Sequence, residues 1–163
     1  MLTEAEKRLH RCCFTGHRPE KLQRSAIDIR CDLESAILKA YHDGLTVFIS
    51  GMARGIDIEA AEIVLYLKRR GYPIRLICIV PFPGFEINWS ETWKNRYENI
   101  IVNADIVRFV CPQYCADCFR LRNEWLVNHS ARVIAVFNGQ SGGTKNTIDY
   151  AHKQGIPVIE IMG

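Results

Sequence analysis

The sequence predicts an α/β fold in which a doubly wound, mainly parallel β-sheet carries helices on both faces. Short apolar runs rich in Val and Ile alternate along the chain with longer segments whose apolar residues recur every three or four positions. Most of the short runs lack an alternation of apolar and polar residues, as expected of strands that are covered on both faces. Strand and helix therefore succeed each other as right-handed βαβ units, the pattern of a parallel sheet.

The predicted strands have the length and the β-branched composition typical of buried strands. In chain order they lie near 11–15 (RCCFT) and at 46–50 (TVFIS), 74–80 (IRLICIV), 105–110 (DIVRFV), 132–137 (RVIAVF) and 157–161 (PVIEI).

The predicted helices lie between these strands. In chain order their apolar stripes run over 26–41, 56–67, 89–101, 119–127 and 147–152. Gly44 follows the first stripe and is a residue type favoured where a helix ends. Gly71 and Pro73 mark the end of the second stripe in the same way.

Size and charge limit the class of protein. With 163 residues and 48% hydrophobic content, the chain has the length of one ordinary domain, and we expect a single domain over residues 1–163. Its 21 basic and 18 acidic residues give a formal net charge of +3, and the basic residues are scattered along the chain. Such a mild charge does not favour a nucleic-acid partner.

The sequence contains no segment typical of export or membrane insertion. The stretch MLTEAEKRLHR is charged from its fourth residue and lacks the apolar region of a secretory signal. No apolar stretch approaches the roughly 18 residues that a membrane-spanning helix requires. We therefore expect a cytoplasmic protein with no membrane partner.

The seven cysteines do not form a recognisable metal site. Cys111, Cys115 and Cys118 are grouped in CPQYCADC, but a zinc site usually takes four ligands from two paired clusters, and no second cluster lies nearby. We expect no metal. Whether the grouped thiols have a structural or a redox role stays open at this point.

Ligands of parallel sheets bind at the carboxyl ends of the strands, where the strand order reverses. The loop after the first strand, TGHRPEKL, brings Gly16, His17 and Arg18 to this edge. Gly16 permits a tight turn, and His17 and Arg18 are suited to contact an anion. The alternative is a surface turn with solvated charges. The ordinary pKa range of histidine leaves His17 open as a catalyst, a ligand or a hydrogen-bonding loop residue.

The loop after the second strand, from Ser50 to Asp57, precedes a helix whose free amides favour phosphate. Its glycines, Gly51 and Gly55, flank the small residue Ala53 and allow a ligand to approach the backbone. Asp57 either contacts ribose hydroxyls or is an ordinary partner of the helix dipole.

Aromatic residues follow the third strand. Phe82, Phe85 and Trp89 either fill the core or form a wall on which a base stacks.

The loop after the fifth strand, FNGQSGGTKNTIDYA, is the most favourable segment for phosphate. Gly142 and Gly143 let backbone amides converge, and polar side chains surround them at Asn138, Thr144 and Thr147. No acidic residue precedes the final helix there, so an anion meets amides and hydroxyls without repulsion. Together, the glycine-bearing loops after the first, second and fifth strands predict a site for a phosphate-bearing ligand.

Four segments, TGHRP, SGMARGIDIEAAE, RNEWLVNHSARVIAVFNG and SGGTKNTIDYA, together resemble the SLOG superfamily. This Rossmann-like group contains DNA-processing protein A and the Lonely Guy phosphoribohydrolases. The chain is most similar to its small stand-alone YpsA-like branch, from about residue 12 to residue 161. The resemblance implies a site for a nucleotide or a nucleotide derivative, with an NAD-like or ADP-ribose-like ligand and a sensing role, and it implies a homodimer.

The resemblance also assigns ligand-binding roles to the three loops and to an Arg-Asn pair before the fifth strand, for which helix capping and surface pairing are the alternative. The residues so assigned are Gly16, His17, Arg18, Ser50, Gly51, Ala53, Gly55, Asp57, Arg122, Asn123, Asn138, Gly142, Gly143, Thr144 and Thr147. No catalytic residue and no cofactor is identified.

The sequence leaves three functions open. The first is a binding module that senses a nucleotide-derived small molecule. The second is an enzyme that cleaves a nucleotide, with Asp57, Glu59 or Asp149 as acid or base, although residues 141–149 lack the proline, the third glycine and the glutamate of the phosphoribohydrolase pattern. The third is a single-stranded nucleic-acid binder using Arg18, Arg54, Lys145 and the aromatic residues, which the mild charge does not favour.

Overall fold

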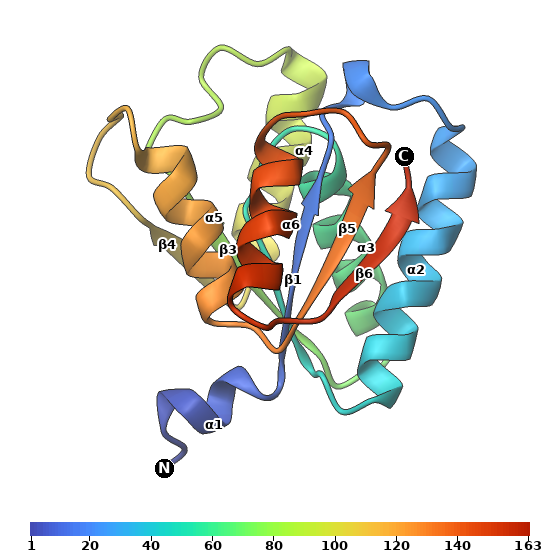
Figure 1. Cartoon of the computed structure of the whole chain (residues 1–163). Coiled ribbons are helices and arrows are strands. Elements are labelled where there is room, and N and C mark those ends of the chain that lie inside the picture. The colour runs from blue at the N-terminus through green and yellow to red at the C-terminus, as the bar shows by residue number, and fades with distance from the viewer.

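The strands lie in one sheet in which every neighbouring pair runs parallel. The computed structural model describes all 163 residues. The strands are β1 (Arg11–Gly16), β2 (Val47–Ser50), β3 (Arg75–Val80), β4 (Ile106–Phe109), β5 (Arg132–Phe137) and β6 (Val158–Met162). The six-stranded sheet has the order β4-β3-β2-β1-β5-β6, and helices cover both of its faces (Figure 1). The predicted α/β fold is confirmed, and the sheet is wholly parallel.

Every predicted helix is present, and two short helices were not predicted. The helices are α1 (Glu4–Arg8), η1 (a 3-10 helix, Pro19–Lys21), α2 (Ala26–His42), α3 (Ile56–Arg69), α4 (Glu91–Asn103), α5 (Cys118–Asn128) and α6 (Gly143–Lys153). The sequence does contain a signal for α1, because Thr3 and Glu6 form a capping box. No helix of this fold combines the length and the apolar content needed to cross a bilayer.

The helices divide unequally between the two faces of the sheet. Helices α2, α3 and α4 cover one face with a larger hydrophobic core, and α5 and α6 cover the other with a smaller one (Figure 1). Side chains of β1 alternate between the cores: Phe14 belongs to the larger and Cys13 to the smaller. The central strands therefore need apolar residues on both faces, which explains why their sequences do not alternate.

The aromatic residues after β3 belong mainly to the larger core. Phe85 is buried there, and Phe82 and Trp89 pack against the same core while half-buried. The rings of Phe85 and Trp89 lie 5.1 Å apart between centroids in an edge-to-face arrangement. These rings therefore fill the core and do not form a stacking wall.

The strand order reverses between β1 and β5. From β1 the chain adds β2, β3 and β4 on one side, and it then returns to place β5 and β6 on the other. Just past the end of β1, the His17 amide donates a hydrogen bond to the Val136 carbonyl oxygen of β5 at 3.2 Å. The loops after β1 and β5 consequently lie together at the reversal, where ligands of parallel sheets bind.

Candidate functional site

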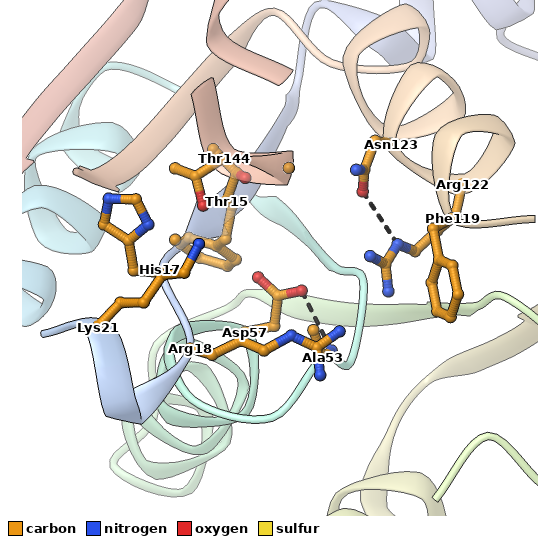
Figure 2. A pocket seen from close by; sticks show the side chains of 13 residues that line it. Thr15, His17, Arg18, Lys21, Ala53, Asp57, Phe119, Arg122, Asn123 and Thr144 are labelled. Carbon is orange, nitrogen blue, oxygen red and sulfur yellow. Dashed lines mark hydrogen bonds between the residues drawn. The ribbon is translucent and has the colours of Figure 1, made fainter. Parts of the chain in front are cut away.

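A pocket of about 180 Å³ opens at the carboxyl edge of the sheet, beside the reversal. Its wall comes from four segments: the end of β1 with the turn that follows, the loop and first turn of α3, the start of α5 and the start of α6 (Figure 2). The lining residues are Phe14, Thr15, Gly16, His17, Arg18, Lys21, Ala53, Asp57, Phe119, Arg122, Asn123, Gly143 and Thr144.

The structure brings most of the residues assigned from the sequence into this wall. Those that line the pocket are Gly16, His17, Arg18, Ala53, Asp57, Arg122, Asn123, Gly143 and Thr144. The others, Ser50, Gly51, Gly55, Asn138, Gly142 and Thr147, lie outside the lining, and their contacts shape the loops around the pocket.

Ser50 and Gly51 hold the loop after β2 in an unusual conformation. Met52 has a φ of 61°, a left-handed value that is uncommon for a residue other than glycine. The Ser50 hydroxyl accepts a hydrogen bond from the Met52 amide at 3.2 Å and donates one to the Asp57 carbonyl oxygen at 2.8 Å. The Gly51 carbonyl oxygen accepts a hydrogen bond from Arg122 Nη1 at 2.7 Å. These contacts fix the backbone that presents Ala53 and Asp57 to the pocket.

Two glycines are required by close packing and by backbone conformation. A Cβ atom on Gly16 would lie 2.4 Å from Ile56 Cβ, so Gly16 allows β1 and α3 to approach and its role is not that of a turn residue. Gly55 has a φ of 100°, and a Cβ atom there would lie 2.9 Å from Pro19 Cδ. Gly16 therefore shapes the pocket from within its wall, and Gly55 does so from outside the lining.

Asp57 and Arg122 are opposite charges buried in the same wall. Asp57 is 6% exposed in the first turn of α3, and its Oδ2 accepts a hydrogen bond from the Ala53 amide at 3.1 Å. Arg122 is also 6% exposed, and its Nε donates to Asn123 Oδ1 at 3.1 Å. Burial raises the pKa of Asp57, although Arg122, the Ala53 amide and Arg18 favour its charged form. Burial likewise lowers the pKa of Arg122, which Asp57 opposes.

His17 lines the pocket and has one unsatisfied polar atom. Its side chain is 3% exposed, and its buried Nε2 atom has no hydrogen-bond partner in the protein. Burial and the Lys21 ammonium group lower the pKa of His17, although the Asn138 side chain opposes this shift, so the imidazole is neutral at neutral pH. Buried polar atoms are nearly always hydrogen-bonded, and an exception in a pocket wall indicates a missing partner.

The start of α6 presents free backbone donors to the same pocket. Gly142 is the N-cap with a φ of 139°, no side chain caps the helix, and no acidic residue lies in its first turn. The Thr147 hydroxyl donates to the Gly143 carbonyl oxygen at 2.9 Å, so it braces the first turn. Uncapped amides at a helix start attract anions, because the helix dipole adds to their partial positive charge.

Lys21 is a site residue that the sequence did not single out. Its ammonium group donates a hydrogen bond to the Ser141 carbonyl oxygen at 3.4 Å, just before α6. Its backbone is held by Asn138, whose Nδ2 donates to the Lys21 carbonyl oxygen at 2.8 Å. The only sequence signal for Lys21 was its positive charge in the same loop as His17. Phe119 also lines the pocket, and the sequence predicted it only as part of a helix stripe.

The other two acid-base candidates, Glu59 and Asp149, form ion pairs away from the pocket lining. Glu59 pairs with Arg30 at 2.6 Å and with Arg96 at 2.6 Å. Asp149 pairs with Lys145 at 2.7 Å. Asp57 is thus the one carboxylate in the pocket wall among the three acid-base candidates.

Arg54 and Lys145, two of the basic residues considered for nucleic-acid binding, are also paired. Arg54 Nη2 lies 2.8 Å from a carboxylate oxygen of Glu20, and Lys145 is held by Asp149. Arg18 is the member of that basic set that lines the pocket.

Related bacterial sequences align with this chain over most of its length. A UPF0398 protein of Halalkalibacterium halodurans is 28% identical over 80% of this chain and 74% of its own length. A UPF0398 protein of Oceanobacillus iheyensis is 29% identical over 85% of this chain and 80% of its own. The SPbeta prophage-derived protein YoqJ of Bacillus subtilis is 30% identical over 65% of this chain and 69% of its own.

Two solved structures share the fold. DNA processing protein A (DprA) of Helicobacter pylori, described with a single-stranded DNA binding mode, has a TM-score of 0.67 at 19% identity, covering 96% of this chain and 66% of that one. DprA of Streptococcus pneumoniae has a TM-score of 0.68 at 21% identity, covering 95% of this chain and 51% of that one. The present chain therefore spans only part of either protein.

The YpsA family model, described as the YspA SLOG family, matches residues 12–156. This range contains every residue of the pocket wall. The resemblance to the YpsA-like branch is confirmed, and the chain belongs to the YspA SLOG family.

Proposed function

We propose that this protein binds a nucleotide or a nucleotide derivative of the ADP-ribose class and acts as a binding module that senses it. The observation that carries the proposal is that His17, whose buried Nε2 has no partner, lines the same pocket as the uncapped start of α6. An anion placed between them would satisfy both features with one ligand.

In the proposed complex, a phosphate group lies against the first turn of α6. The amides of Gly143 and Thr144 donate to its oxygens, and Lys21 and Arg18 balance its charge. The neutral His17 side chain, in the tautomer that carries the proton on Nε2, donates a further hydrogen bond.

The sugar lies toward Asp57 in this proposal. A carboxylate hydrogen-bonds well to a pair of ribose hydroxyls, and Asp57 lies in the wall beside Arg122 and Asn123. A volume of about 180 Å³ is below the roughly 300 Å³ at which ordinary small-molecule pockets begin. We therefore propose that the phosphate and the sugar occupy this pocket and that the base lies outside it.

A neighbouring groove between α5 and α6 is suited to the base. It has a volume of about 360 Å³ and shares Phe119, Asn123 and Gly143 with the pocket. Its further lining residues are Arg120, Glu124, Asn146, Thr147 and Tyr150. Aromatic rings offer stacking surfaces for a base, and amide side chains offer hydrogen bonds to its edge.

Cleavage of the nucleotide is the second candidate. It is favoured by the position of Asp57, a buried carboxyl group in the pocket wall, because hydrolysis needs a carboxyl group within hydrogen-bond reach of the reacting group. We place this candidate second because Glu59 and Asp149 are held in ion pairs elsewhere.

The experiment is calorimetry with AMP, ADP-ribose and NAD, combined with mass spectrometry of the recovered ligand. The test variant is Gly143→Asp, with Gly143→Asn as the neutral control of the same shape. A Cβ atom on Gly143 meets nothing within 4 Å, and an acidic residue in the first turn favours a helix, so both variants should fold.

We expect saturable binding with intact ligand by the wild type, retention by Gly143→Asn, and loss by Gly143→Asp. Retained binding by a folded Gly143→Asp variant would exclude a phosphate at α6. Release of a base or a ribose phosphate, lost in Asp57→Asn, would establish the enzyme. Binding of single-stranded DNA that weakens steeply with salt would favour a DprA-like ligand instead.

A cytoplasmic location and a homodimer complete the proposal. Exposed apolar side chains gather near the β4 edge, where Val102 is 82% exposed and Phe109 is 48% exposed and where both line one shallow hollow. Light scattering coupled to size exclusion should give the mass of two chains for the wild type and of one for Val102→Glu. A monomeric wild type would overturn the dimer.

A further inference from the structure

Two thiols in the loop between β4 and α5 lie within reach of each other. Cys111 Sγ and Cys115 Sγ are 3.6 Å apart, and both side chains are half-buried. Of the other cysteines, Cys31 is exposed on α2, and the rest are buried. No set of three potential ligands from His, Cys, Asp or Glu lies together as a metal site would require.

The backbone holds both cysteines in place. The Cys111 amide donates a hydrogen bond to the Pro81 carbonyl oxygen at 3.0 Å, which ties it to the end of β3. The Cys115 carbonyl oxygen accepts a hydrogen bond from the Cys118 amide at 3.2 Å, which ties it to the start of α5. A disulfide bond is about 2 Å long, so the two sulfur atoms must approach each other by roughly 1.6 Å to form one.

We propose that Cys111 and Cys115 are a redox modification site, forming an intrachain disulfide by exchange with a low-molecular-weight disulfide such as oxidised glutathione. The thiolate of one cysteine attacks a sulfur of the reagent, and a mixed disulfide forms as one reduced thiol leaves. The second cysteine loses its proton to solvent and attacks the protein sulfur of the mixed disulfide, releasing the second reduced thiol. The dithiol loses two electrons and two protons, and one molecule of reagent is reduced to two thiols.

The thiol pair is connected to the pocket through aromatic contacts. Tyr114 lies between the two cysteines in sequence, and its ring centroid is 5.6 Å from that of Phe82 and 6.4 Å from that of Phe119. Phe119 lines the pocket from the first turn of α5. The disulfide therefore restrains the wall of the pocket, and a regulatory effect on the ligand rests on the function proposed above.

The experiment exposes the full-length wild type to oxidised glutathione, alkylates the remaining thiols and maps the cysteine peptides by mass spectrometry. We expect one intrachain bond between Cys111 and Cys115. The Cys111→Ser variant should instead stop at a glutathione adduct on Cys115, and Cys31→Ser should behave like the wild type. A wild type that carries glutathione on Cys115 with no intrachain bond, or that reacts only at Cys31, would overturn the proposal.

Hydrogen exchange separates the redox site from its effect on the pocket. The amides at the start of α5 should exchange more slowly in the oxidised form, and equal exchange in both forms would overturn the connection to the pocket. AMP is the probe for regulation, with a different affinity expected in the two forms. If AMP, ADP-ribose and NAD bind neither form while the disulfide still forms and slows exchange, the proposed function is wrong and the redox site is retained.

Discussion

His17 shows how burial changes the meaning of a residue. In the sequence it is one histidine in a charged turn, open to several roles. In the structure its ring is buried 5.3 Å from the ring of Phe137, beside Lys21, with Nε2 unpartnered. The neighbours that make His17 a candidate ligand residue are Phe137 of β5 and Lys21 of η1. Neither residue belongs to the TGHRP segment, so that segment alone could not predict these contacts.

His17 should also couple the stability of the fold to pH. Its pKa is lowered from 6.5 by burial first and by Lys21 second. As the pH falls below 6.5, the unfolded chain takes up a proton that the folded chain resists. The contribution of His17 to stability is therefore complete above 6.5 and is lost as the pH falls toward the folded pKa.

We predict that the urea midpoint falls between about pH 7 and about pH 5.5 more steeply for the wild type than for His17→Gln. The exposed His152→Gln is the matched control and should follow the wild type. Equal slopes for the wild type and His17→Gln would show that the proton uptake of His17 does not differ between the folded and unfolded chains.

At the scale of elements, the start of α6 differs most from the sequence prediction. The helix was expected from 147, because the glycines before it resemble a loop. It begins at Gly143, since Gly142 adopts the positive φ that leads the chain from the loop into the first turn. The amides of a GG sequence thus belong to a helix start, and a helix start binds anions better than a flexible loop does.

The groove between α5 and α6 gives a prediction at the same scale. Asn146 is exposed in the groove, and a tryptophan in its place would fill the proposed base site. We predict that Asn146→Trp weakens AMP binding about tenfold, within the range that base stacking contributes, and leaves ribose 5-phosphate binding unchanged. The control is His152→Trp, on the same helix but outside the lining.

Calorimetry with both compounds checks this prediction. An equal loss of affinity for AMP and ribose 5-phosphate would indicate that the tryptophan interferes with phosphate binding. No loss of affinity for either compound would show that the base does not bind in the groove.

At the scale of the whole molecule, the two cores share one sheet. Leu33 of α2 is fully buried in the larger core, and Leu126 of α5 is 1% exposed in the smaller. We predict that Leu33→Ala and Leu126→Ala each lower the free energy of unfolding by about 2–5 kcal/mol, because each leaves a cavity.

The two cores should also unfold together, since the central strands contribute to both. Circular dichroism and tryptophan fluorescence should give one coincident transition in denaturant for the wild type and for both variants. Two separate transitions would show that one face of the sheet unfolds without the other.

The sequence by itself determined the strands and the longer helices of this protein and the edge at which its candidate site lies. Apolar periodicity indicates which face of each strand or helix is buried, and this local property was sufficient to predict a parallel sheet. Placing Gly16, Asp57 and Gly143 after strands was enough to bring them to one edge.

Only the tertiary structure decided which side chains meet there. Arg122 reaches the Gly51 carbonyl oxygen, Lys21 reaches that of Ser141, and Cys111 lies 3.6 Å from Cys115. The first two contacts depend on the strand order and on the packing of α5 and α6, and the third depends on the path of one loop. Local periodicity carries no information on any of these, because it records burial and not the partner against which a residue is buried.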